Sequence, residues 1–362
     1  MTHEALSPTK SSERRLRAPR VTSSERIFVL ANGRPHQRQG HDLLASYLGA
    51  HSEQLRSWQA TTLQKALAIY LRRIRPYSRL SPRNAYTLFR ADSYLRAQRK
   101  GGLIHLLWGD ELIEHVRRPE SCIFTLHQPY ETWTAAAWSQ IASSAGIICM
   151  AERECAEIWR REPTIPCVFI PHGVDVEFWR PQSEKPLRQI CAVGRYLRNF
   201  EMFLRVARVI LERHRDVTFQ WVVNPDFTLS AEMISQLPPQ RFHLLRNLTP
   251  IDLRRLYSES WLFCMPYENV TASNAIVEAM ASGTPVFTTR VGGMPSYAGD
   301  DAITMVPNND DDAMVAAVSQ CLTCPEIRES LSARARRHAQ THFSWPIVAA
   351  AHERFYCQLL EA

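Results

Sequence analysis

The chain has 362 residues, more than the roughly 250–300 residues over which one hydrophobic core grows, so we expect two domains. Hydrophobic residues make up 45% and charged residues 22%, which is the balance of a globular protein and argues against a disordered one. No apolar run approaches the roughly 18 residues that a transmembrane helix needs. The formal net charge of +7 is compatible with an anionic binding partner.

The first residues and the cysteines indicate the cellular compartment. Residues 1–24 are rich in Ser, Thr, Pro, Glu and Arg and lack the apolar stretch of a signal peptide, which predicts a disordered basic tail. The nine cysteines are scattered, and several lie in apolar runs where a free thiol packs as a small hydrophobic side chain. This pattern favours a reducing cytoplasm over a disulfide framework.

Short apolar runs alternate with helical periodicity along the chain. In the first half, strands are predicted at 27–30, 103–107, 122–126, 147–150 and 167–170, a helix is predicted to begin near Gly40, and helical stretches are predicted over 60–100. In the second half, strands are predicted at 190–193, 219–223, 242–245, 261–264 and 286–289, with helices at 203–214, 251–258, 275–282 and 345–360. Apolar strands that alternate with helices predict parallel sheets and an α/β fold.

A basic stretch runs from Lys65 to Lys100, with ten basic residues and a single acid, Asp92. One interpretation is a solvated helical face. The other is contact with an anionic membrane surface or with a phosphorylated or lipid-linked acceptor. Because the stretch has no recognisable nucleic-acid-binding motif in which stacking aromatic residues alternate with the basic ones, we expect no nucleic-acid partner.

The segment from Met265 to Val286 combines a strand end, a polar loop and a helix. Ser273 or Asn274 suits the N-cap, and Gly283 suits the residue just after the helix. A helix that begins at a strand end presents free N–H groups and its dipole to an anion, most often phosphate. Glu278, one turn further in, can accept hydrogen bonds from ribose hydroxyls, although a surface acid on a helix is the alternative.

The run from Asn274 to Val286, Asn-Ala-Ile-Val-Glu-Ala-Met-Ala-Ser-Gly-Thr-Pro-Val, resembles the signature of the retaining family-4 or "group 1" glycosyltransferases, which have the GT-B fold. The resemblance implies that the helix start binds the donor diphosphate and that Glu278 binds the nucleotide ribose. Val270 stands where the family has its first glutamate, and Glu268, two positions earlier, is expected to take that catalytic place. The donor-binding residues implied around the helix start are Thr271, Ser273, Asn274, Ala275 and Ile276.

Two further segments resemble the same family. The turn from Gly194 to Arg198 resembles the glycine–arginine turn that grips the donor phosphates, which implies that Arg195 binds the donor and that Arg198 acts in catalysis. A plain turn with surface charges is the alternative. His127, after a predicted strand, matches a histidine near the transferred sugar, and a structural loop histidine is its alternative. Gly40 matches a glycine-rich loop under the donor phosphates.

The resemblance also implies the domain organisation. We expect two Rossmann-like domains with mainly parallel sheets that face each other across a cleft. The expected ranges are 25–182 for the acceptor-side domain, 183–343 for the nucleotide-sugar-binding domain and 344–362 for a helix that crosses back to the first domain.

The function implied is transfer of a sugar, with retention of anomeric configuration, from a nucleotide-diphosphate donor to a glycan, lipid-linked or other small acceptor of the cell envelope. No Asp-x-Asp motif ends a predicted strand, so we expect neither a metal ion nor another cofactor. The alternatives are a GT-B nucleotide-sugar epimerase and a non-catalytic binding protein with a degenerate transferase site. The expected location is the cytoplasm, with peripheral contact at the inner face of the membrane through residues 65–100.

Overall fold

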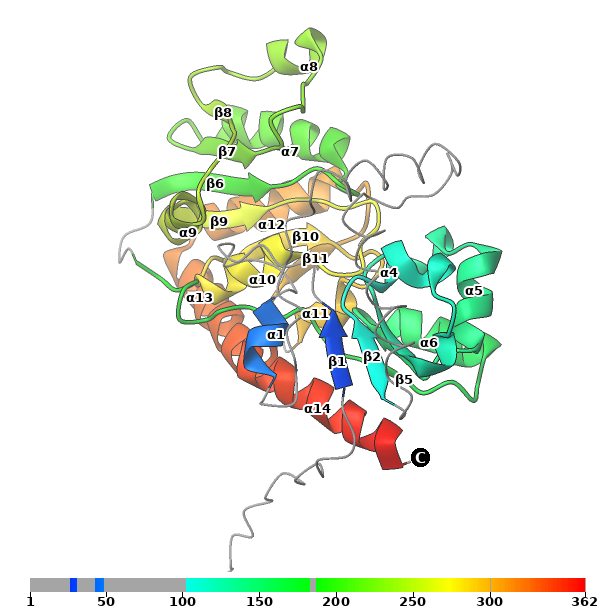
Figure 1. The fold of residues 1–362 in the computed structure, drawn as a ribbon. Coiled ribbons are helices and arrows are strands. Elements are labelled where there is room, and N and C mark those ends of the chain that lie inside the picture. Colours follow the sequence, from blue (N-terminus) through cyan, green and yellow to red (C-terminus); the bar gives the residue numbers. More distant parts are fainter. Residues whose placement is uncertain (1–26, 31–42, 49–101, 183–186, 300, 362) are drawn as a thin grey trace, which may run out of the picture.

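The computed structural model describes residues 27–30, 43–48, 102–182, 187–299 and 301–361. These residues form two parallel β-sheets, one in each half of the chain, with helices around them (Figure 1). The predicted α/β class with parallel sheets is therefore confirmed. The predicted tail, Gly40, the helices over 60–100 and the basic stretch lie outside the described residues.

The first sheet has five strands in sequential order, and every neighbouring pair is parallel. Each strand predicted in the first half is present. The strands are β1 (Ile27–Leu30), β2 (Leu103–Leu106), β3 (Cys122–Leu126), β4 (Gly146–Cys149) and β5 (Cys167–Phe169). The helices around them are α1 (Leu44–Tyr47), α4 (Gly109–Leu112), η2 (Ile113–His115), η3 (Pro119–Ser121), η4 (Tyr130–Thr132), α5 (Ala135–Ala142) and α6 (Glu152–Arg161).

The second sheet has six strands in the order β11-β10-β9-β6-β7-β8, again all parallel. The strands are β6 (Leu187–Val193), β7 (Thr218–Val222), β8 (Phe242–Leu245), β9 (Ser260–Cys264), β10 (Val286–Thr289) and β11 (Thr304–Val306). β6 pairs with β7 on one side and with β9 on the other, so the direction of strand addition reverses between β6 and β9. Ligands of open parallel sheets bind at the carboxyl ends of the strands at such a switch point.

Helices of the second half cover both faces of this sheet (Figure 1). Most of them are amphipathic and bury one face, whereas α10 is buried over almost its whole length. The predicted helices over 203–214, 251–258 and 275–282 are present, while β11, α12 and α13 were not predicted. The helices are α7 (Phe200–Arg213), α8 (Ala231–Ser235), α9 (Pro250–Glu259), α10 (Asn274–Ala281), α11 (Pro295–Ala298), α12 (Asp311–Thr323), α13 (Pro325–His338) and the π-helical turn η5 (Ala339–Phe343).

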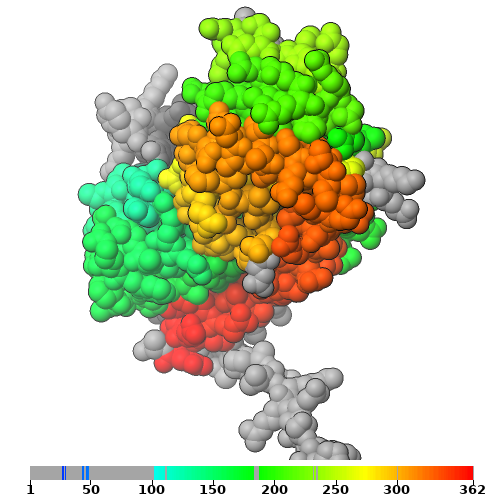
Figure 2. Space-filling model, turned by 180° about the vertical axis from the view of Figure 1, so that it is seen from behind, coloured from blue at the N-terminus to red at the C-terminus, as the bar shows by residue number. Residues whose placement is uncertain are grey.

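The last helix, α14 (Trp345–Glu361), leaves the second half and packs against the first sheet (Figure 1). A Cβ at Gly146, in β4, would lie 3.0 Å from the Phe355 ring and 2.9 Å from Leu359, so the helix approaches the strand closely at a glycine. Seen from behind, α14 runs along the lower edge of the first domain (Figure 2). The expected crossing of the last helix back to the first domain is confirmed.

A buried polar network fastens α14 to the first sheet. The imidazole of His105, in β2, is hydrogen-bonded through Nε2 to Thr125 Oγ1 and through Nδ1 to the hydroxyl of Tyr356, each at 2.6 Å. Burial lowers the pKa of His105 well below its usual value, so this imidazole is neutral and has one donor and one acceptor nitrogen. Both ring nitrogens of His105 therefore make hydrogen bonds at a position that solvent does not reach.

In the part of the chain that the structure describes, no helix combines the length and the apolar character needed to cross a bilayer.

Removing the Tyr356 hydroxyl should destabilise the fold. Tyr356→Phe leaves one nitrogen of His105 buried without its partner, which costs about 1–3 kcal/mol in the free energy of unfolding. Thermal or urea unfolding followed by circular dichroism measures this loss. Tyr130→Phe, at the half-buried Tyr130, is the matched control and should unfold like the wild type. Equal stability of Tyr356→Phe and the wild type would show that the network does not hold the helix.

Candidate functional site

The loop after β6 forms a tight turn that only a glycine permits. Gly194 has φ +86°, a left-handed conformation that is strained for other residues. A Cβ at Gly194 would also lie 3.0 Å from Nη2 of Arg198. The missing side chain therefore allows the guanidinium of Arg198 to fold back over the turn.

Arg198 is directed toward the start of α10. Its Nη1 donates to the carbonyl of Tyr196 at 2.7 Å, and its Nη2 lies 3.4 Å from Ser273 Oγ. The guanidinium carbon is 4.6 Å from the centre of the Tyr267 ring, a cation–π distance. These contacts bring the turn after β6 and the loop after β9 together at the switch point, and they hold the half-buried Arg198 against the start of α10.

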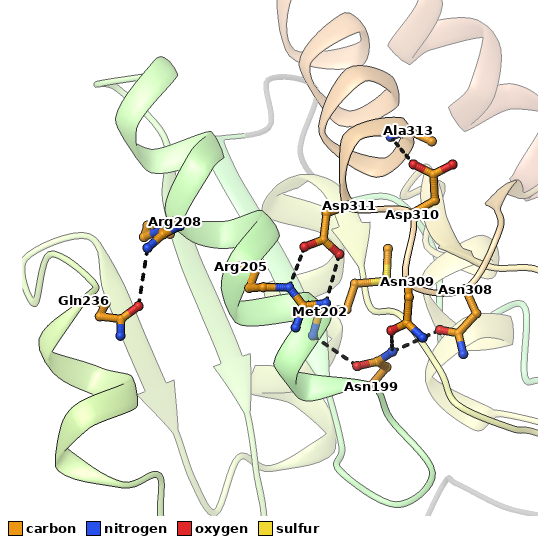
Figure 3. Close-up of polar contacts among 10 residues, drawn as sticks. All are labelled: Asn199, Met202, Arg205, Arg208, Gln236, Asn308, Asn309, Asp310, Asp311 and Ala313. Carbon is orange, nitrogen blue, oxygen red and sulfur yellow. Dashed lines mark hydrogen bonds and ion pairs between the residues drawn. The ribbon is translucent and has the colours of Figure 1, made fainter.

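Asn199, 5% exposed, anchors this turn to the rest of the domain (Figure 3). Its Nδ2 donates to Asn308 Oδ1 at 3.0 Å and to Asn309 Oδ1 at 2.8 Å, while its Oδ1 caps α7. The ion pair of Arg205 with Asp311, at 2.5 Å, ties α7 to the first turn of α12 (Figure 3). The residue after Arg198 is therefore fixed, which limits how far the guanidinium can move.

The N-cap residue of α10 does not cap the helix with its side chain. Ser273 occupies the N-cap position, yet its hydroxyl makes no capping hydrogen bond and lies 2.8 Å from the hydroxyl of Tyr267. Thr271 is 2% exposed, and its Oγ1 is buried with no hydrogen-bond partner among the described residues. Buried polar atoms are nearly always paired, so these groups form a place where a polar ligand would supply missing partners.

The remaining predicted residues of this segment differ in burial. Asn274 is half-buried at the first helical position, and Ala275 and Ile276 are buried behind it, so their backbone amides and not their side chains can meet a ligand. Glu268 is exposed, and its backbone N–H donates to the carbonyl of Leu197 at 3.0 Å. Val270 is 4% exposed and packs into the core of the domain.

Glu278 is 4% exposed, so it is not a surface acid. The Tyr257 hydroxyl, from α9, donates to its Oε2 at 3.4 Å. Burial raises the pKa of Glu278 to about 8, and the hydrogen bond from Tyr257 offsets this only in part. The side chain is therefore protonated near neutral pH, and a ligand that donates hydrogen bonds to it would favour the ionised form.

Arg195 takes a different direction from Arg198. Its Nη2 lies 3.7 Å from Asp226 Oδ2, and its guanidinium carbon lies 5.9 Å from the centre of the Phe227 ring. Nearly half of the side chain is exposed. The structure thus brings Arg198, Thr271, Ser273 and Asn274 together but directs Arg195 toward the loop after β7.

His127 follows β3 in the first domain. Its Nε2 is 2.7 Å from the carbonyl of Leu107, which only accepts, so Nε2 carries the proton. The ring stacks on Trp108 with centroids 4.6 Å apart. The half-buried carboxylate of Asp110 accepts hydrogen bonds from the backbone N–H groups of His127 and Gln128, and desolvation raises the pKa of Asp110. The backbone therefore holds His127 in one orientation.

Two contacts join the domains at this place. The hydroxyl of Tyr196 donates to Gln128 Oε1 at 2.7 Å, so the turn that carries Arg198 touches the loop that carries His127. The hydroxyl of Tyr297, in α11, donates to the carbonyl of Met150 at 2.8 Å and accepts from the backbone N–H of His172 at 3.0 Å. The turn that carries Arg198 and the loop that carries His127 therefore border the junction between the domains.

The sequence analysis did not identify Tyr196, Gln128, Asn199 or Tyr267 as site residues. Each lies within a motif or beside one, but a polar side chain in a loop gives no signal of its partner. Tyr196 and Gln128 are 68 positions apart, and no local pattern predicts such a pair.

The second half of the chain is similar to known proteins. Residues 188–324 match the family described as glycosyl transferases group 1. The MMP α-(1→4)-mannosyltransferase of Mycolicibacterium hassiacum is 32% identical over 193 residues, which cover 50% of this chain and 46% of that protein. D-inositol 3-phosphate glycosyltransferase 2 of Catenulispora acidiphila is 25% identical over 309 residues, which cover 76% of this chain and 71% of that one. The first of these matches spans less than half of the relative.

Solved structures show the same architecture over nearly the whole chain. Sucrose-phosphate synthase from Thermosynechococcus elongatus superposes with a TM-score of 0.69 at 17% identity and covers 93% of this chain and 99% of that one. Anabaena HepE in complex with UDP and glucose gives 0.65 at 13% identity and covers 92% and 99%. These neighbours show that the chain has the GT-B fold, and its residues 188–324 are similar to the group 1 glycosyl transferases.

Proposed function

We propose that this protein is a retaining glycosyltransferase that moves a sugar from a nucleoside-diphosphate donor to a glycan, lipid-linked or other small acceptor. One observation carries the proposal: at the switch point of the second sheet, Arg198 contacts the uncapped start of α10, and the loop before it holds the Thr271 hydroxyl, which has no partner among the described residues. The relatives support it, since they are named as a mannosyltransferase and as inositol phosphate glycosyltransferases, and HepE was solved with UDP and glucose.

The chemistry requires stabilisation of a leaving diphosphate. As the bond between the anomeric carbon and the diphosphate oxygen breaks, negative charge grows on the diphosphate and positive charge on the sugar ring. Fixed N–H dipoles at the start of α10 and the charge of Arg198 would stabilise the first of these charges, because they need no reorganisation during the reaction. The acceptor oxygen then bonds to the anomeric carbon from the same face, and its proton passes to the departing diphosphate. We propose no metal ion in this step.

Glu278 is the proposed acceptor for the ribose hydroxyls. It lies one turn inside the helix whose start would hold the diphosphate, so one helix would bind both parts of the nucleotide. Two hydroxyl donors would favour the carboxylate form and lower the raised pKa of Glu278. Donor affinity and the ionisation of Glu278 are then linked.

The acceptor is proposed to enter on the first domain. A pocket there begins at Asp110 and Gln128, beside the loop of His127, and is also lined by Glu114 and Trp133. The indole N–H of Trp133 is buried and has no hydrogen-bond partner among the described residues. A hydroxyl-rich acceptor would satisfy it and would stack on the ring. Peripheral contact with an anionic membrane through residues 65–100 remains part of the proposal.

A degenerate, non-catalytic donor-binding protein is the second candidate, because Val270 is buried where the family has a glutamate and Glu268 is exposed. Analysis of the reaction products distinguishes a transferase, an epimerase and a degenerate protein. A transferase forms a glycosylated acceptor and hydrolyses the donor slowly without one, an epimerase forms a new sugar nucleotide from the donor alone, and a degenerate protein binds the donor but does neither.

A screen of nucleoside diphosphates and their sugars by thermal shift should identify one base that raises the melting temperature. Binding to the folded state stabilises it by about 2.7 kcal/mol when the ligand is at 100 times its Kd. No shift with UDP, GDP, ADP or their sugars would argue against a donor site.

Thr271→Val is the informative variant in this screen. It replaces an unpartnered buried hydroxyl by a methyl group of similar volume, so the free protein should be as stable as the wild type or more so. The ligand-induced shift should fall, because the contact from the hydroxyl is lost. A full shift in this variant would show that Thr271 does not touch the ligand.

Arg198→Ala should weaken binding of the nucleoside diphosphate about tenfold to hundredfold, since a hydrogen bond to a charged group contributes about 1.5–3 kcal/mol. Isothermal titration calorimetry measures the affinity. Arg195→Ala, a change of the same kind on the same turn, should cost less, because that guanidinium faces Asp226. Equal losses, or a greater loss with Arg195→Ala, would contradict the geometry.

Glu278→Gln should change how stability depends on pH. The pKa of about 8 in the folded protein lies above the usual value of 4.5, so the folded state binds more protons between these values and wild-type stability falls as the pH rises through this window. The loss approaches about 1.4 kcal/mol per pH unit. Glu278→Gln should lack this loss when melting temperatures are compared from pH 5 to pH 8. Glu268→Gln, at the exposed Glu268, is the control and should follow the wild type.

A further inference from the structure

Three cysteine side chains meet in the first domain, away from the proposed donor site. Cys149 is the last residue of β4, Cys167 is the first residue of β5, and Cys155 lies in α6 between them in sequence. All three Sγ atoms lie within 4.8 Å of one another, and those of Cys149 and Cys167 are 3.7 Å apart. In the described part of the chain, this is the group of metal-ligating side chains that is compact enough to share one ion.

The strand register argues against a disulfide between Cys149 and Cys167. Ile147 pairs with Cys167 and Cys149 pairs with Phe169, so the two cysteines point to the same face but are offset by two residues. With strands about 4.8 Å apart and a rise of about 3.3 Å per residue, their Cα atoms are about 8 Å apart. A disulfide spans at most about 6.8 Å between Cα atoms. The sulfurs can therefore approach each other but cannot bond without a shift of β4 or β5 along the other strand.

The same spacing fits two sulfurs on one ion. A zinc–thiolate bond is about 2.3 Å long, so two thiolates at a tetrahedral angle place their sulfurs about 3.8 Å apart. The observed 3.7 Å between Cys149 and Cys167 agrees with this value. Thiolate ligands select soft or borderline ions such as Cu⁺ and Zn²⁺ over Mg²⁺ or Ca²⁺.

We propose that Cys149, Cys155 and Cys167 form a three-thiolate binding site for a thiophilic closed-shell ion, Zn²⁺ or Cu⁺. Cu⁺ is satisfied by three thiolates, whereas Zn²⁺ takes a water molecule as its fourth ligand. Cys149 and Cys155 are buried and Cys167 is half-buried, so the side of Cys167 is where a water ligand would have the shortest way in. The thiol protons pass to solvent as the ion binds, and neither ion changes its oxidation state.

A bound ion would rigidify the segment of the first domain that contacts the second domain. Met150, directly after Cys149, accepts the hydrogen bond from Tyr297. Glu152, at the start of the helix that carries Cys155, donates its backbone N–H to Ser296 at 3.1 Å. Because the ion would link β4, β5 and α6, it would fix the loop between β4 and α6 and stabilise the fold. This role is structural and does not depend on the proposed transfer reaction.

Metal retention by the full chain tests the site. The reduced, chelator-treated protein is equilibrated with Zn²⁺ in one arm and with Cu⁺ under anaerobic conditions in the other, passed through a competing chelator and analysed by mass spectrometry for metal. We expect about one ion per chain in at least one arm, together with a higher melting temperature. Cys155→Ala should lose the ion. Cys122→Ala should keep it, because Cys122 is a buried cysteine of the adjacent strand β3 that lies outside the cluster.

A second measurement uses the unmodified protein, in case the variants do not fold. Alkylation with iodoacetamide, mapped by peptide mass spectrometry, should show that the retained ion protects the half-buried Cys167 but not the half-buried Cys357 of α14. Retention of neither ion, equal retention by Cys155→Ala, or alkylation of Cys167 at the same rate with and without the ion would overturn the proposal.

Discussion

The candidate site depends on the contact between the guanidinium of Arg198 and the first residues of α10. This contact joins two loops that leave neighbouring strands, β6 and β9, on opposite sides of the switch in strand order. Gly194 makes the fold-back of Arg198 sterically possible, and Tyr267 supports the guanidinium from its ring face. A positive charge is thus held beside uncapped backbone amides, an arrangement that favours an anion.

The supporting residues matter because an electrostatic site works only if its charges are fixed before the ligand arrives. Asn199 fixes the turn that carries Arg198. It donates hydrogen bonds to Asn308 and Asn309 and caps α7, so the end of the turn is held by the loop before α12. On the other side of the domain junction, the carboxylate of Asp110 holds the loop of His127. Both halves of the site therefore rest on partly buried hydrogen bonds.

Two kinds of contact hold the domains together, one buried and one exposed. Tyr297 is buried and uses its hydroxyl twice, and α14 packs across the first sheet, so separating the domains would expose apolar surface and unpaired polar groups. The contact of Tyr196 with Gln128 is different, because Tyr196 is 59% exposed. Opening of the domains would break this exposed bond first, at the place where donor and acceptor would meet. The proposed three-thiolate site lies beside the contact between Tyr297 and Met150, and a bound ion would stabilise this contact.

The sequence by itself determined the α/β class, the strands of both sheets that it predicted, and the helix start near Ser273 and Asn274, because apolar periodicity, capping residues and glycine positions act locally. It did not predict β11, α12 and α13, whose patterns are weaker, for example the highly charged α13. Tertiary structure alone decided that Glu278 is buried, that Arg198 and not Arg195 faces α10, and that three cysteines scattered in the sequence converge on one point. The physical reason is that burial, side-chain direction and sulfur spacing are set by packing between segments far apart in the chain, and no local pattern of residues encodes them.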